Sequence, residues 1–274
     1  MRVEYSSLGR VLYAIAVIGM GVICLVYLDF VNSLQPVPPS LPGYRPLAIA
    51  TGIVLVVAGL AIMMRFRMHA AALALVALFV AWIVLLHIPS AFTDPSLLRS
   101  PFWIRTFESL GLAGAALILA GLAADPVREQ WVRVGRIALG VSLPVFGVLH
   151  LVYPENVAAL VGTAILPYPW PLFWAYLTGA GHIAAGVAIA SGVWARSASI
   201  LAGLMYASWA LTLHLPRVID NPAPRSVDNP AGYGGDRGEL TSLCVCVAFW
   251  GAAWIVAGSL GKASATDRRR LQQE

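Results

Sequence analysis

Residues 70–88 read AAALALVALFVAWIVLLHI, a stretch without Asp, Glu, Lys or Arg. A helix of about 20 apolar residues crosses the hydrocarbon core of a bilayer, so this stretch has the length and composition of a transmembrane span. Its apolar residues are continuous rather than alternating, which is typical of a spanning helix and not of a membrane β-barrel strand. The sequence therefore predicts an α-helical membrane protein.

Comparable apolar stretches recur along the whole chain. Hydrophobic residues make up 59% and charged residues 11% of the sequence, against about 25% charged residues in soluble domains. We predict an all-α membrane protein with about eight transmembrane helices, which span roughly residues 11–29, 47–64, 70–88, 105–123, 137–153, 172–193, 198–215 and 240–259. A basic residue precedes the first span, as in a signal peptide. That span lacks a small-residue cleavage site and has a counterpart deeper in the chain, so we expect it to remain in the mature protein.

The end of the opening stretch reveals an internal duplication. Leu86-His87-Ile88-Pro89 recurs 127 residues later as Leu213-His214-Leu215-Pro216, and a shift of 126 aligns residues 21–27 with residues 147–153. Each copy holds an even number of spans, which predicts two parallel tandem four-helix-bundle repeats related by an axis near the membrane normal. We expect residues 8–89 to superpose on residues 134–216 in this way. The predicted parts are a first unit (1–123), a cytoplasmic link (124–133), a second unit (134–262) and a basic cytoplasmic tail (263–274).

The formal charge of +5 is a topology signal rather than a sign of nucleic-acid binding. Of the 18 Arg and Lys residues, 12 fall on one predicted side and six on the other. The positive-inside rule then predicts a multi-pass protein of the cytoplasmic (inner) membrane with both termini in the cytoplasm. The side with 12 holds Arg2, Arg10, Arg65, Arg67, Arg128, Arg133, Arg136, Arg196, Lys262, Arg268, Arg269 and Arg270; the other holds Arg45, Arg99, Arg105, Arg217, Arg225 and Arg237.

The second unit resembles the DoxX-like integral membrane proteins. The resemblance rests on a Gly-Arg start (Gly135-Arg136), His150 late in the first helix and His182 in a Gly-rich second helix. It continues through a His-Leu-Pro-Arg-Val run (residues 214–218) and a Glu-x-Thr-Ser opening of the last helix (residues 239–242). It implies a four-helix unit and an association with redox physiology, including quinone-linked thiosulfate oxidation in some relatives. Many relatives have Glu in place of His182, and the single unit is doubled here, so no catalytic role is carried over.

Ionisable residues inside membrane spans are costly and are functional-site hypotheses by default. The second unit holds His150, His182, His214 and Glu239, whereas the first has only His87 at a matching place. We predict that these four residues of the second unit form one cofactor-binding site that opens outward. Imidazole suits a metal, a haem or a quinone. Our predicted span ends place His150 and His182 at different depths, which favours a site bridged by a quinone, a haem edge or waters over a compact metal centre.

A structural role for the same residues is the alternative. His87 and His214 are expected to bond backbone carbonyls near helix ends, and Glu108 and Glu239 to begin the last helix of each unit, where carboxylates favour the helix dipole. Aromatic residues near span ends, including Tyr44 and Trp174, fit an interfacial belt.

Three function classes remain open from the sequence. The first is a redox-associated membrane subunit that contacts a membrane or extracytoplasmic protein partner. The second is a non-catalytic subunit of a larger complex, and the third is a small-molecule transporter. The transporter interpretation lacks broken helices at corresponding places in the two units. Whether the chain is an enzyme is left open, and no phosphate-binding loop, nucleophile elbow or metalloprotease His pair is present.

Overall fold

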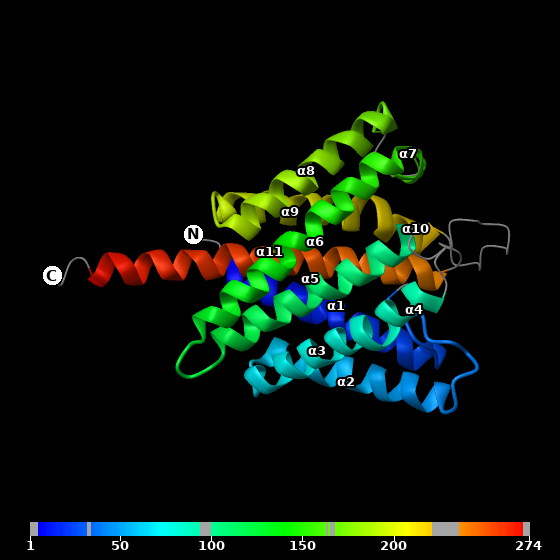
Figure 1. The fold of residues 1–274 in the computed structure, drawn as a ribbon, viewed down its shortest axis with the longest axis horizontal. Helices are drawn as coiled ribbons and strands as arrows, with labels where there is room; N and C mark the ends of the chain where they lie inside the picture. Colours follow the sequence, from blue (N-terminus) through cyan, green and yellow to red (C-terminus); the bar gives the residue numbers. More distant parts are fainter. Residues whose placement is uncertain are drawn as a thin grey trace.

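The computed structural model describes residues 5–31, 34–93, 100–162, 164, 168–220 and 236–270. All regular secondary structure within these residues is helical, as Figure 1 shows. The elements are α1 (Tyr5–Tyr27), α2 (Tyr44–Met64), α3 (Met68–Trp82), η1 (Ile83–His87), α4 (Ile88–Thr93), α5 (Ser100–Leu122), α6 (Glu129–Val152), α7 (Pro154–Val161), α8 (Pro171–Ser191), α9 (Ala195–Trp209), η3 (Ala210–His214), α10 (Leu215–Asp220) and α11 (Asp236–Arg270).

Eight helical stretches within the described residues are long and apolar enough to cross a membrane, as the sequence predicted. Two of them are composite: α3, η1 and α4 join into Met68–Phe92, and α9, η3 and α10 join into Ala195–Ile219. Most helices begin a few residues before the predicted span. The predictions followed the apolar stretches, whereas a helix can also include more polar residues in its first turn. The two termini, the α2–α3 turn and the α5–α6 link lie at one end of the molecule (Figure 1). Which end faces the cytoplasm stays a prediction.

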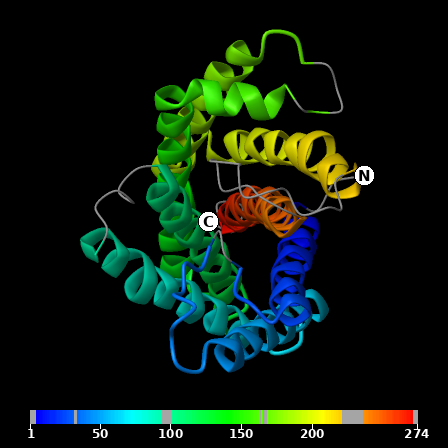
Figure 2. The same cartoon turned by 90° about the vertical axis from the view of Figure 1, so that its right-hand side faces the viewer.

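Each spanning helix packs against its neighbours along the chain, and α11 closes the arrangement by packing on α1. Helix α11 also contacts α5, α9 and α6, so the last helix of the second unit lies between the two halves. Figure 2 shows α11 near the centre, with α1, α5 and α9 around it. The core is therefore shared by both halves rather than divided into two separate bundles.

Glycines set the closest helix crossings. A Cβ atom on Gly9 of α1 would lie 2.6 Å from the carbonyl oxygen of Gly251 in α11, and one on Gly114 of α5 would lie 2.6 Å from that of Gly135 in α6. No side chain fits at these separations, so small residues let the backbones touch. Gly9 and Gly135 are 126 residues apart, as in the sequence alignment of the two halves, whereas Gly114 and Gly251 are 137 residues apart.

An arginine at the start of each half caps the end of the next spanning helix. Arg10 donates through Nη1 to the carbonyl oxygens of Ile62, at 2.6 Å, and of Met63, near the end of α2. Arg136 donates in the same way to Ile189 and Ala190, near the end of α8. These bonds satisfy carbonyls that a helix end leaves without intrahelical partners. The two caps and the two glycine contacts occupy corresponding places, while the duplication and the rotation that relates the halves stay predictions.

Both halves also carry a π-helical segment at the same place. Segments η1 and η3 each contain five residues and each ends in a histidine, His87 or His214, at a shift of 127. Single π turns are rare and frequently mark functional sites. These segments were not predicted from the sequence, because the i→i+5 hydrogen bonds of a π-helix have no simple residue signature. Both histidines are buried, with exposed fractions of 1% and 7%.

Candidate functional site

His182 is held at both ring nitrogens inside the second half. Its Nδ1 lies 3.0 Å from the carbonyl oxygen of Thr178, and its Nε2 lies 3.0 Å from the hydroxyl of Tyr206. A carbonyl oxygen only accepts, so Nδ1 carries the proton and Nε2 accepts from the Tyr206 hydroxyl. With an exposed fraction of 1%, His182 has no ring nitrogen left for a ligand in this arrangement.

His150 keeps one ring nitrogen unused by these bonds. Its Nδ1 lies 3.0 Å from Oγ1 of Thr178, and that hydroxyl donates its single proton to the carbonyl oxygen of Trp174 at 2.7 Å. The hydroxyl must therefore accept from His150, which places the proton on Nδ1 and leaves Nε2 as an acceptor. His150 is half-buried and lies two residues before the end of α6.

Aromatic rings surround the two histidines. The ring centroids of His150 and His182 are 5.1 Å apart, and His150 stacks on Trp209 at 5.7 Å with an interplanar angle of 22°. Trp209 also contacts the His182 ring, at 5.3 Å between centroids. We call this group the histidine–aromatic cluster; it consists of Phe146, His150, His182, Tyr206, Trp209 and Phe249.

The expectation that His150 and His182 lie at different depths is wrong. His150 lies directly opposite Gly179, since a Cβ atom on Gly179 would be 3.0 Å from that of His150. Only three residues of α8 then separate the level of His150 from His182, a rise of about 4.5 Å that the side chains bridge. Predicted span ends do not fix where two antiparallel helices cross.

His214 and Glu239 form a second, ionic cluster. His214 Nδ1 lies 3.1 Å from Oε2 of Glu239, and Arg217 lies 2.5 Å from Oε1 of the same carboxylate. Glu239 belongs to the first turn of α11 and has an exposed fraction of 4%. The expected backbone bond is found at His87, whose Nε2 lies 2.8 Å from the carbonyl oxygen of Leu34. For His214 that expectation is wrong, because a carboxylate lies within reach.

The two clusters are neighbours rather than one contact group. Eight residues separate Tyr206 from His214 along the chain, about 12 Å at the rise of an α-helix. Cys246 of α11 lies within electrostatic range of both residues. Within the described residues, no three His, Cys, Asp or Glu side chains group closely enough to hold a metal ion. Whether all four predicted residues serve one cofactor stays a prediction.

For three further residues, Glu108, Thr178 and Tyr206, the structure differs from the site predicted from the sequence. Glu108 does not begin the last helix of the first half, because α5 starts at Ser100 and places it in the third turn, near Tyr206 and His214. Thr178 and Tyr206 were not among the residues predicted from the sequence. Thr178 precedes His182 by four residues and so shares its helix face, a signal that was available. Tyr206 gave no such signal, because its bond depends on how α8 and α9 pack.

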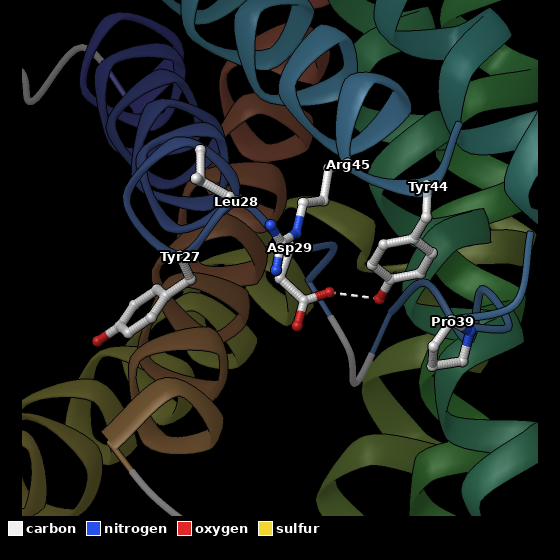
Figure 3. A pocket seen from close by; sticks show the side chains of 6 residues that line it. All are labelled: Tyr27, Leu28, Asp29, Pro39, Tyr44 and Arg45. Carbon is white, nitrogen blue, oxygen red and sulfur yellow. Dashed lines mark hydrogen bonds between the residues drawn. The ribbon is translucent and has the colours of Figure 1, made fainter. Parts of the chain in front are cut away.

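A cavity of about 330 Å³ lies in the first half, and its lining contains no histidine (Figure 3). Its lining is Tyr27, Leu28, Asp29, Pro39, Tyr44 and Arg45. The Asp29 carboxylate accepts hydrogen bonds from the backbone N–H of Phe30 at 2.7 Å, from the Tyr44 hydroxyl and from Arg237 at 2.8 Å. Burial opposes ionisation of Asp29, but these hydrogen bonds outweigh it and lower the pKa. Tyr44, expected only in an interfacial belt, therefore has a specific partner.

Comparison with protein-family models finds a similarity within the second half. Residues 132–215 match the DoxX family model. This stretch is therefore similar to the DoxX family, and we call the half that contains it the DoxX-like half. The match covers α6 to η3 and so includes His150, His182 and His214 of the DoxX-like half, while Glu239 lies beyond it. Comparison with curated proteins and with solved structures gave no match.

Proposed function

We propose that this DoxX-like membrane protein is a subunit of a redox system, and that its histidine–aromatic cluster receives the headgroup of a reduced quinone. The observation that carries the proposal is the acceptor at His150 Nε2, next to an indole ring in a half-buried position. A hydroquinone offers what this arrangement lacks: a hydroxyl donor for Nε2 and a flat ring for stacking. A quinone carbonyl only accepts and would suit this tautomer less well.

The residues take different roles in this proposal. His150 contacts the headgroup, whereas His182 positions the cluster through Thr178 and Tyr206. Exposed apolar side chains of α6 lie beside His150, including Val148, Leu151 and Val152, so a lipid-soluble quinol can approach from the bilayer. A metal bound by both histidines is disfavoured, because three of their four ring nitrogens already have partners.

The test measures quinone content of the purified protein. We expect His150→Leu to lose bound quinone while circular dichroism shows an intact fold. His182→Leu should weaken quinone binding by disturbing the cluster. His69→Gln is the matched control, because His69 is half-buried near the opposite end, where it bonds the carbonyl oxygen of Ala120. Full quinone content in the folded His150→Leu variant would refute the site, and would favour histidines that only join helices.

A transport function is the second candidate, and the π segments favour it. Segments η1 and η3 widen two spanning helices at corresponding places, a milder form of the helix breaks that mark substrate sites in duplicated transporters. Uptake of redox-neutral solutes into proteoliposomes would support it. A subunit without chemistry of its own predicts a stoichiometric protein partner, no quinone and no uptake, which native mass spectrometry and the same vesicles would report.

A further inference from the structure

The cavity of the first half has a lining that the quinone proposal does not use. It lies where α1 ends and α2 begins, at the end of two spanning helices and therefore at headgroup depth in a bilayer (Figure 3). One side is polar, with Asp29, Tyr44 and Arg45. Another side is apolar, with Leu28 46% exposed. A ligand that fits must therefore join a polar group to an apolar body.

The charges of the cavity leave one cation available. Arg237 pairs with Asp29 at 2.8 Å, and Tyr44 donates a hydrogen bond to the same carboxylate. Within the described residues, Arg45 is exposed and makes no hydrogen bond or ion pair. With Asp29 neutralised by Arg237, the cavity has a local charge of about +1. An anionic group suits it, and guanidinium binds phosphate oxygens through paired N–H groups.

The apolar surroundings favour a lipid over a free anion. Leu41 precedes α2 and Leu47 lies in its first turn, with exposed fractions of 41% and 47%, and Val26 at the end of α1 is 67% exposed. Acyl chains can pack along these side chains while a headgroup occupies the cavity. A free phosphate ion would use Arg45 alone and would leave the apolar side unoccupied.

The corresponding part of the DoxX-like half has a different lining. At the shifts of 126 and 127, Arg45 corresponds to Pro171 and Leu172, neither of which is charged. Asp29 corresponds to Glu155 at the shift of 126 and to Asn156 at the shift of 127. The cationic lining of the cavity is therefore a feature of the first half that the corresponding positions of the DoxX-like half do not repeat.

We propose that this cavity binds the phosphate group of a phospholipid through Arg45, with the acyl chains along the exposed apolar side chains of α1 and α2. The site is independent of the quinone proposal. Its occupant is one specifically bound lipid, distinct from the bulk bilayer.

The experiment uses the full chain in detergent, with dioleoyl phosphatidylglycerol as the probe and native mass spectrometry as the readout. Dioleoylglycerol, which has the same chains and no phosphate, is the matched control ligand. We expect retention of one phosphatidylglycerol and weak retention of dioleoylglycerol. Arg45→Gln should lower phosphatidylglycerol affinity about tenfold, the change expected when a charge-assisted contact is lost. Arg196→Gln, at an exposed arginine of the opposite end, should leave it unchanged.

Three results would overturn the proposal. They are equal retention of both lipids, equal phosphatidylglycerol affinity in Arg45→Gln and the unaltered chain, and binding of inorganic phosphate alone with the same affinity as the lipid. The first removes the role of the phosphate, the second removes the role of Arg45, and the third removes the role of the acyl chains. Arg45 is exposed, so the variant is expected to fold, and circular dichroism verifies this.

Discussion

The hydrogen bond between Tyr206 and His182 can be tested by removing each partner in turn. Tyr206→Phe deletes the hydroxyl and leaves a buried acceptor, His182 Nε2, without a donor. An unsatisfied buried polar group costs about 1–3 kcal/mol, and the small void left by the hydroxyl adds little. His182→Leu has the converse effect and leaves the Tyr206 hydroxyl, in a residue 4% exposed, without an acceptor. We expect each variant to lower the free energy of unfolding by about 1–3 kcal/mol.

The double variant separates this bond from general packing effects. With both polar partners removed, no buried group is left unsatisfied, so the double variant should be less destabilised than the sum of the single variants by about 1–2 kcal/mol. Equilibrium denaturation in mixed micelles, followed by tryptophan fluorescence, measures all three free energies. Tyr168→Phe is the control, since its hydroxyl bonds only the side chain of Thr212, at 3.2 Å, in a less buried place. A coupling energy within about 0.3 kcal/mol of zero would show that the Tyr206–His182 bond is wrong.

Three further predictions concern the fold. Arg10→Met and Arg136→Met should each lower the free energy of unfolding by about 1.5–3 kcal/mol, because each variant loses the same charge-assisted helix cap. If the two losses differ by more than about 2 kcal/mol, the two arginines do not have matching roles. Folding lowers the pKa of Asp29, so the ionised carboxylate stabilises the folded state by about 0.2–1 kcal/mol. This stabilisation is present above the unfolded pKa near 3.9 and is lost as the pH falls through the lower pKa of the folded state. Denaturation between pH 6 and pH 3 should thus show a smaller acid-induced loss for Asp29→Asn than for the unaltered chain, and an equal loss would count against the pairing. A cysteine at Ser226, in the segment between α10 and α11 that lies outside the described residues, should react with impermeant reagents from the periplasmic side of intact cells; labelling only in inverted vesicles would reverse the topology.

The sequence determined the class of fold because bilayer length and apolar composition are local properties. Residues 70–88 identify a span without any knowledge of their neighbours, and the same holds for the other seven stretches within the described residues. The repeated His-x-Pro segment and the Gly-Arg pairs were also visible in one dimension. The matched contacts of Arg10 and Arg136 then gave a physical role to a motif that the sequence had supplied only as a pattern.

The tertiary structure alone decided which polar residues meet. His150 and His182 approach one another because α6 and α8 cross at Gly147 and Gly179, and span ends read from hydropathy cannot specify that crossing. His214 pairs with a carboxylate while His87, its match at the shift of 127, bonds a backbone carbonyl. The Asp29–Arg237 pair joins residues 208 positions apart. Hydropathy along the chain sets which segments are buried in the bilayer, but only the packing of side chains between helices sets the partner of each polar atom, because that contact depends on crossing point, rotation and tilt together.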